Sequence, residues 1–370
     1  MYDSSQPYAS QRSPVAAENL VATSQPLAVE AGIQALRKGG NAMDAALSAA
    51  ITLTVVEPNN NGLGSDAFCI LWDGSELIGI NGSGRSPRRW TRSHFEGRQV
   101  MPALGWDCVT VPGAVSTWVA LSKRFGKLPF ADLFESAIHN AGEGFLVGPK
   151  SAYYWKLLKN HYKDFEAFKE HFHPIPEAGE RFVRKDMAKT LELIAESEGE
   201  AFYRGEIADR IIAASKDGGG LMDKADLENH SADWVKPISQ SYRGSELHEI
   251  PPNGQGLAAQ IALGILDHKE LGVVDSEESV HLQIEAMKIA VRAANEHFAD
   301  PKAMTVSPEE LLEPGSIEKA AASIGEKASV LPPVKLPYSE DTVYLTTCLL
   351  YTSDAADEGL GVDLGGRRII

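Results

Sequence analysis

The chain has 370 residues, of which 43% are hydrophobic and 23% charged, a composition typical of a globular protein with one large or two medium domains. Its formal net charge is −16 and its sequence pI is about 5.1, so the average surface repels phosphate backbones and anionic membranes. These values argue against nucleic acids and membranes as partners.

The sequence shows no targeting or disulfide pattern. Residues 1–7 lack the basic start and the apolar run of a secretory signal, and no later apolar run is long enough to span a bilayer. Cys69, Cys108 and Cys348 show neither a pairing pattern nor metal-ligand spacing. We therefore expect a cytoplasmic protein without disulfides, in which Cys69 is a buried structural thiol.

The N-terminal part is predicted to begin with two helices. Ser24 is a candidate N-cap for the first helix, which Gly39-Gly40 would end. Residues 42–56 are apolar on nearly every face, and this pattern predicts a helix that is buried all round and ends at Glu57-Pro58. A turn-rich loop then leads to a predicted strand at 67–72.

The rest of the chain mixes helices with short strands. Strands are expected at 77–80 and 108–111, and helices at 114–125, 206–215, 257–266 and 278–298. Between residues 151 and 200 the pattern is largely helical, with aromatic residues spaced to pack on one face. A Pro-rich segment, 331–337, predicts a non-helical linker that delivers the chain to Asp341 in an extended form.

Motifs for metals and nucleotides are weak. His171 and His173, with His161 upstream, have no carboxylate or cysteine at a matching second-ligand spacing. Gly62-Leu63-Gly64 lacks the third glycine of a dinucleotide fingerprint, so a turn is expected there. We therefore predict neither a metal nor an organic cofactor.

An ordered series of segments is similar to the large subunit of the gamma-glutamyltransferase (glutathione hydrolase proenzyme) family. The segments that carry this resemblance are 21–28, 37–46, 55–62, 111–115, 124–129, 202–208, 242–244, 251–256 and 285–288. Residues 341–347 resemble the point at which a precursor of this family cuts itself. Most of the segments are expected to be scaffold, and Glu285 with Lys288 is expected to be a solvated helix pair.

The resemblance implies an α+β architecture, the four-layer αββα sandwich of N-terminal-nucleophile hydrolases, here truncated. Residues 1–341 would be a large-subunit-like region with a Pro-rich linker at 331–340, and 342–347 the start of a small-subunit-like region. Residues 348–370 do not match the family, and we interpret them as a translated sequencing adaptor. Without the rest of the small subunit, this chain itself is expected to be inactive.

The resemblance gives Thr342 a role that its residue type alone would not, because threonine is common in strands. The hydroxyl of Thr342 would attack the carbonyl of Asp341, form an ester by N-to-O acyl shift, and leave a free Thr342 amine after hydrolysis. An α-amine has a pKa of about 7.7 to 8.0, so part of it is unprotonated near neutrality and can act as general base for its own hydroxyl.

The resemblance also implies an arginine that grips the α-carboxylate of the glutamyl group. When the segments are aligned on Pro87, this position falls on Ser83, and Arg85 lies two residues later. Alternate residues of a strand face the same side, so Arg85 is a candidate for the bidentate contact. In the alternative interpretation, Arg85, Arg88 and Arg89 form a solvated basic loop.

The implied reaction is transfer of a γ-glutamyl group, as from glutathione, to water or an amino acceptor by two subunits cut from one precursor. Two alternatives stay open at this stage: a related acylase that acts on another amide, such as a glutaryl side chain on a β-lactam, and a non-catalytic scaffold. The residues do not decide the acceptor, the balance of hydrolysis and transfer, the oligomeric state, or whether Thr346 or Thr347 assists Thr342.

Overall fold

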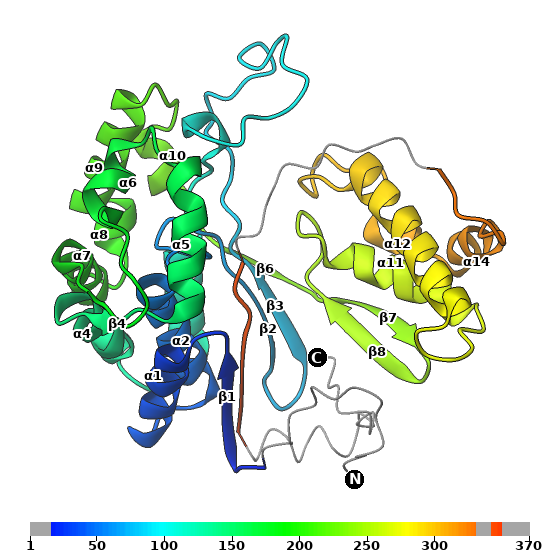
Figure 1. Ribbon diagram of the computed structural model, residues 1–370, viewed down its shortest axis with the longest axis horizontal. Helices are drawn as coiled ribbons and strands as arrows, with labels where there is room; N and C mark the ends of the chain where they lie inside the picture. Colours follow the sequence, from blue (N-terminus) through cyan, green and yellow to red (C-terminus); the bar gives the residue numbers. More distant parts are fainter. Residues whose placement is uncertain (1–15, 331–341, 350–370) are drawn as a thin grey trace.

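The computed structural model describes residues 16–330 and 342–349, which form a larger and a smaller body joined between β6 and β7 (Figure 1). The strands of the larger body are β1 (Asn19–Thr23), β2 (Phe68–Trp72), β3 (Leu77–Asn81), β4 (Phe145–Leu146), β5 (Arg181–Phe182), β6 (Asp233–Val235) and β9 (Leu345–Leu349). Its α-helices are α1 (Pro26–Arg37), α2 (Ala42–Val56), α3 (Ala114–Phe125), α4 (Glu135–Gly142), α5 (Pro149–His161), α6 (Glu166–Phe172), α7 (Lys185–Glu196), α8 (Glu200–Tyr203), α9 (Glu206–Asp217) and α10 (Lys224–Glu228). Short 3-10 helices lie at Trp106–Cys108 and Phe130–Phe134.

The smaller body has its own hydrophobic core. It contains β7 (Ile238–Tyr242), β8 (Ser245–Glu249), α11 (Gly256–Asp267), α12 (Glu277–His297), α13 (Pro308–Leu311) and α14 (Pro314–Ala322). Leu257 and Ile265 of α11 are fully buried in this core, against Ala286 of α12 and Ile317 of α14.

Helix α2 is the centre of the larger body. Asn41 and Asp44 form a capping box at its start, and the buried carboxylate of Asp44 also accepts hydrogen bonds from the backbone N–H groups of Lys127 and Leu128. The helix is buried on every side, as its composition predicts, and Glu57 ends it before Pro58. The start of the helix therefore also holds the loop that follows α3.

The sheets of the described residues are small. β2, β3 and β6 form an antiparallel sheet in which Cys69 pairs with Ile80, and β7 pairs with β8. β1 pairs antiparallel with β9, from Asn19 opposite Leu349 to Thr23 opposite Leu345. The architecture is therefore mixed α and β, and residues 16–330 and 342–349 do not by themselves form the two stacked sheets of the predicted sandwich.

Several predicted elements are confirmed, and two details are wrong. The helix predicted at 278–298 is found at Glu277–His297. Gln25, not Ser24, caps α1, because the side chain of Gln25 accepts from Leu27 N. Residues 108–111 do not form a strand, since Val111 shares only one backbone hydrogen bond with the passing chain, to the carbonyl of Arg85 at 2.9 Å.

The pair Glu285 and Lys288 is not solvated as predicted. Glu285 is 4% exposed, and its carboxylate accepts hydrogen bonds from Lys288 Nζ and from the backbone and hydroxyl of Ser329. These bonds, led by the one from Lys288, lower the pKa of Glu285 to about 2. The segment after α14 folds back over α12 and covers this carboxylate.

Cys69 is partly buried, and burial raises the pKa of its thiol to about 11. Within residues 16–330 and 342–349, no helix has the length and apolar character needed to cross a bilayer. The same residues contain no cluster of three or more His, Cys, Asp or Glu side chains that could hold a metal ion.

Candidate active site

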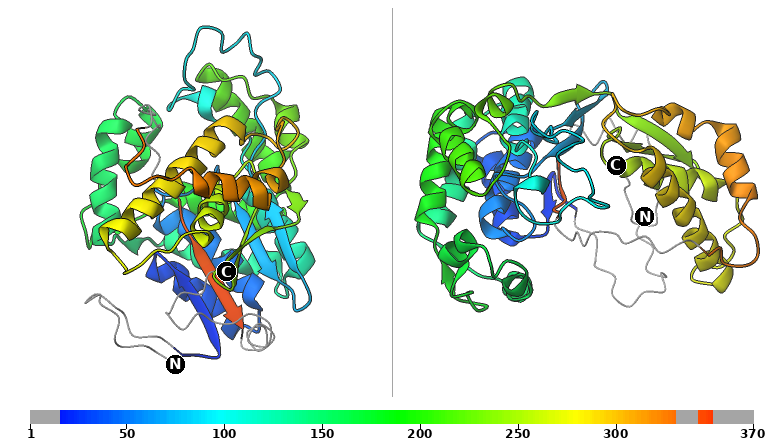
Figure 2. Two further views of the ribbon diagram at one scale, coloured as in Figure 1. Left: turned by 90° about the vertical axis from the view of Figure 1, so that its right-hand side faces the viewer. Right: turned by 90° about the horizontal axis from the view of Figure 1, so that it is seen from above.

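Thr342 is exposed and begins the extended segment that continues into β9. Figures 1 and 2 show this segment between β1 and the β2–β3 hairpin. Two side chains hold it at its ends: Thr23 Oγ1 donates to Tyr344 O at 2.8 Å, and Thr347 Oγ1 donates to Ala42 O at 2.7 Å. The predicted nucleophile therefore lies in the extended segment just before an anchored strand, β9, whereas Asp341 lies outside the described residues.

Polar side chains gather beside the start of this strand. Ser24 follows Thr23 and donates to the carboxylate of Glu57 at 2.5 Å, and Asn60 donates to the other oxygen of Glu57, also at 2.5 Å. Glu57 is 9% exposed and sits at the C-terminus of α2. Since Thr342 is two residues ahead of Tyr344, it lies within about 7 Å of that residue along an extended chain.

Ser83, at the position that the resemblance gives to a carboxylate-binding arginine, belongs to a neutral polar cluster. Its hydroxyl lies 2.7 Å from Asn81 Oδ1 and 3.0 Å from Asn253 Oδ1, and Asn81 Nδ2 donates to Asn253 Oδ1 at 2.9 Å. These groups come from the end of β3 and from the loop between β8 and α11. The cluster offers hydrogen bonds and no positive charge.

Arg85 already has a carboxylate partner within the chain. Its guanidinium makes two hydrogen bonds to Asp233, at 2.9 and 3.2 Å, and its side chain is 46% exposed. Arg88 likewise pairs with Asp223 and with Asp226. The basic loop is thus tied to acidic residues of the larger body, and an external carboxylate would have to compete with Asp233 for Arg85.

Glycines hold the loop that carries Ser83 and Arg85 in one position. A Cβ on Gly82 would lie 1.7 Å from Thr117 Oγ1, and a Cβ on Gly84 would lie 1.5 Å from Val111 O. Gly113 packs against the same loop, and a Cβ added to Gly113 would lie 1.7 Å from Gly82 O. Only glycine allows the two backbones to cross this closely.

A serine and a histidine also meet in the larger body. Ser116 Oγ lies 3.0 Å from His230 Nε2 and donates to Gly113 O at 2.8 Å. Because that hydroxyl gives its proton to a carbonyl, we infer that His230 Nε2 donates to Ser116. His230 Nδ1 is buried without a partner among the described residues, and burial lowers the pKa of His230 to about 4. This arrangement does not activate Ser116 as a nucleophile.

His171, one of the histidines of the weak motif, lies near an acidic residue of α7. His171 Nδ1 lies 3.7 Å from Asp186, which Arg184 also contacts. Hydrogen bonds from Arg184 are the main cause that lowers the pKa of Asp186 to about 2. These residues belong to the α6–α7 region.

The sequence interpretation missed the polar groups beside the strand of Thr342. Ser24 was considered only as a helix cap, and Glu57 only as a helix end. Both residues, however, lie in segments that carry the family resemblance, as does Asn253. The only signal in the sequence was that these segments follow one another in the order found in the family. The contacts themselves, Ser24 with Glu57 and Ser83 with Asn253, join residues 33 and 170 positions apart, so no local pattern shows them.

Comparison with known proteins identifies relatives of the chain. Residues 28–350 match the family model described as gamma-glutamyltranspeptidase. The chain is 34% identical to the "Glutathione hydrolase-like YwrD proenzyme" of Bacillus subtilis (strain 168) over 343 residues, which are 90% of this chain and 65% of the relative. The chain therefore spans a little less than two thirds of the length of that relative.

Two solved structures share the fold. The cephalosporin acylase from Bacillus halodurans superposes with a TM-score of 0.86 at 42% identity, over 95% of this chain and 67% of that chain. The gamma-glutamyltranspeptidase from Pseudomonas nitroreducens superposes with a TM-score of 0.79 at 28% identity, over 84% of this chain and 95% of that chain. The fold is thus similar to proteins named for two different amide substrates.

Proposed function

The chain belongs to the gamma-glutamyltranspeptidase family, and we propose that it is the first part of a precursor that cleaves itself before Thr342 and then cleaves amides. In this proposal, the part of the precursor that the relatives carry in addition completes the four-layer sandwich around β9. The observation that carries the proposal is the placement of Thr342, exposed at the head of a strand that hydrogen bonds anchor to β1 and α2.

The proposed chemistry uses one hydroxyl twice. In the precursor, Thr342 Oγ1 attacks the carbonyl carbon of Asp341, the peptide nitrogen leaves as the Thr342 amine, and water hydrolyses the ester. In the mature protein the free amine accepts the proton of Thr342 Oγ1 as this oxygen attacks the substrate amide. The acyl group then passes to water or to an amino acceptor, and no cofactor is required.

Glu57 is suited to a supporting role in this chemistry. Its buried carboxylate accepts from Ser24 and Asn60 beside the strand that Thr342 begins. Through Ser24 and its neighbour Thr23, which donates to Tyr344 O, Glu57 would hold the segment that starts with the new amine in place. Glu57 is thus proposed as a positioning residue, not as the base.

For the acyl donor, a γ-glutamyl compound such as glutathione is the first candidate, since relatives are named glutathione hydrolases. Two observations favour a second candidate, an acylase with a different acyl group. Arg85 is held by Asp233, and the neutral cluster of Ser83 stands where the resemblance places a carboxylate-binding arginine. The identity of 42% to a cephalosporin acylase supports the same alternative.

Self-cleavage can be tested directly. The chain should be expressed with the region that its relatives carry beyond residue 350, and N-terminal sequencing of the smaller product should begin at Thr342. Thr342→Ala should stay whole, whereas Tyr344→Ala, a change at another exposed position of the same segment, should cleave normally. A Thr342→Ala protein that still separates into two pieces would refute the proposal.

The acyl group can be tested on the cleaved protein. A γ-glutamyl anilide and a glutaryl anilide differ only by the α-amino group, so their kcat/KM ratio reports how much that group is recognised. Asp233→Asn removes the charge that competes for Arg85. If Arg85 grips a substrate carboxylate, this variant should lower KM for both anilides; an unchanged KM would exclude Arg85 from the site.

A further inference from the structure

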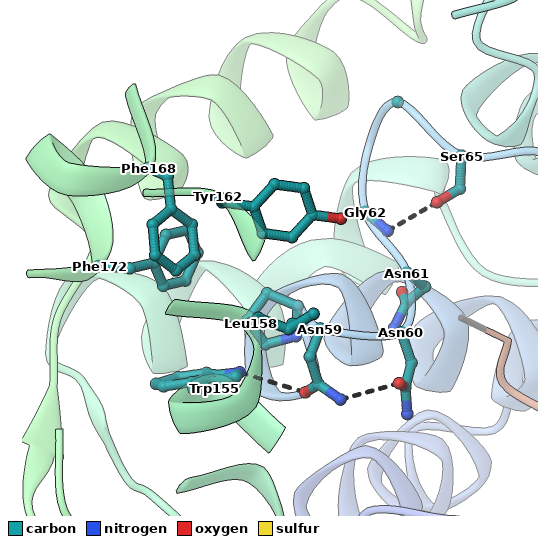
Figure 3. A pocket seen from close by; sticks show the side chains of 12 residues that line it. Asn59, Asn60, Asn61, Gly62, Ser65, Trp155, Leu158, Tyr162, Phe168 and Phe172 are labelled. Carbon is teal, nitrogen blue, oxygen red and sulfur yellow. Dashed lines mark hydrogen bonds between the residues drawn. The ribbon is translucent and has the colours of Figure 1, made fainter. Parts of the chain in front are cut away.

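A cavity of about 380 Å³ opens between the loop that follows α2 and the helices α5 and α6 (Figure 3). Pockets for small organic ligands begin at about this size, roughly 300 Å³. The lining of the cavity comes from the 58–65 loop on one side and from Trp155, Leu158, Tyr162, Phe168 and Phe172 on the other.

One wall of the cavity is aromatic. Phe168 and Phe172 stack with ring centroids 5.3 Å apart, and Tyr162 is tilted against Phe168 at 5.5 Å. Trp155 is 2% exposed and packs its ring edge on Phe172. Of the aromatic residues between 151 and 200 that were predicted to share one face, Trp155, Phe168 and Phe172 do so. The cavity lies between their rings and the loop that follows α2.

The opposite wall consists of amides. Asn61 donates its side-chain N–H groups to the carbonyls of Leu53 and Glu57, at 3.2 and 3.0 Å. Its Oδ1 has no hydrogen-bond partner among the described residues, so it can accept an N–H group from a ligand. None of the lining residues carries a formal charge. A flat apolar group with an amide attached matches both walls.

Hydrogen bonds connect the amide wall to Glu57 and Ser24, which lie beside the segment of Thr342. Trp155 Nε1 donates to Asn59 Oδ1 at 3.2 Å, and Asn59 Nδ2 donates to Asn60 Oδ1 at 2.8 Å (Figure 3). Asn60 in turn donates to Glu57, which also binds Ser24, the neighbour of the residue that holds Tyr344. The cavity and the segment of Thr342 thus share one hydrogen-bonded frame.

From these contacts we propose that the cavity between α2, α5 and α6 binds the flat, uncharged ring of an amide substrate. The inference rests on the proposed function, because it assigns the ring to the substrate of Thr342. Aromatic rings bind a flat ring by stacking or by edge contact. The amide wall would hold the N–H of the substrate against Asn61 Oδ1, and a charged group at this place would lose its hydration without a counter-charge.

Direct binding tests the cavity without any turnover. Phenylacetamide should be titrated into the 370-residue chain while tryptophan fluorescence is followed, since Trp155 lines the cavity. The expected result is saturable binding that Phe168→Ala weakens by about fivefold or more. Tyr153→Ala is the matched control, because Tyr153 lies on α5, is 60% exposed and does not line the cavity. It should change the affinity by less than about twofold.

A second probe and a second variant distinguish loss of the binding site from misfolding of the Phe168→Ala variant. Acetamide, which lacks the ring, should bind far more weakly, and Phe172→Leu, which keeps an apolar side chain, should weaken phenylacetamide less than Phe168→Ala. Equal affinity of phenylacetamide for the unaltered chain and Phe168→Ala, or equal affinity of both probes, would overturn the inference. Loss of self-cleavage with binding intact would instead overturn only the proposed function.

Discussion

The larger and the smaller body differ in how they enclose their longest helices. In α2, 12 of 15 residues are buried. In α12, a helix of 21 residues, only Ser279, Glu285, Ala286 and Ala290 are buried. Val280, Ile284 and Met287 lie on one stripe of α12 and are 42%, 51% and 45% exposed. The larger body is closed around its central helix, whereas the smaller body covers α12 on one side only.

This difference indicates where stability resides. Fully buried apolar side chains contribute most to folding, and half-exposed ones contribute little. The strand of Thr342 packs on the larger body, with Val343 and Leu345 against its core. The position of the predicted nucleophile should therefore depend on α2 and hardly on the outer face of α12.

The largest expected effect is that of a cavity in α2. Ile51→Ala removes a side chain that is 0% exposed, and should lower the free energy of unfolding by about 2–5 kcal/mol in urea denaturation. Ile265→Ala, equally buried in α11, should cost a similar amount. If the two bodies unfold separately, the two variants will shift different transitions; a shift of one common transition by both would mean that the bodies unfold together.

The next effect is pH dependence from His230 in the larger body. Its pKa is about 4 in the folded protein because it is buried, against about 6.5 when unfolded. Between pH 6.5 and 4, by these same values, the unfolded state binds a proton that the folded state does not, so stability falls as the pH is lowered. The loss should reach up to about 3 kcal/mol and stop growing below the folded pKa.

His230→Gln should remove that part of the pH dependence. The measurement is the difference in free energy of unfolding between the original chain and the variant at several pH values, because other carboxylates cancel in the difference. A difference that stays constant from neutral pH down to about pH 4 would show that folding does not lower the pKa of His230.

The smallest effect is expected on the open side of the smaller body. Ile284→Ala should change the free energy of unfolding by less than about 0.5 kcal/mol, because the side chain is 51% exposed. Its effect should thus be several-fold below that of Ile51→Ala, measured in the same urea titration. A loss as large as that of Ile51→Ala would reveal that α12 is covered in solution.

Local patterns predicted much of the fold. The helix predicted at 114–125 has those bounds in the structure, and the all-apolar run of α2 correctly indicated complete burial. These features depend on residues within one helix, where composition and caps decide the outcome. The exposed face of α12 was not foreseen, because an apolar stripe predicts burial whether or not a partner is present.

The contacts of the candidate site were not predicted, because they join distant residues. The pairs Arg85–Asp233 and Ser83–Asn253 are 148 and 170 residues apart in the sequence. No local pattern specifies such pairs. The family resemblance supplied Thr342, whose exposed position in the segment before β9 is compatible with the assigned role. That role stays a prediction, as does the cleavage after Asp341.

The crossing of Gly82 and Gly84 with Val111 and Gly113 has a consequence for how substrate choice can evolve. Backbone that leaves no room for a Cβ tolerates few insertions or shifts, so the positions between and after these glycines are fixed in space while their side chains are free to vary. Under the proposed function, exchange of the residue at 83 or 85 alone would change acyl preference without moving the backbone, so these two positions would make a small library for engineering.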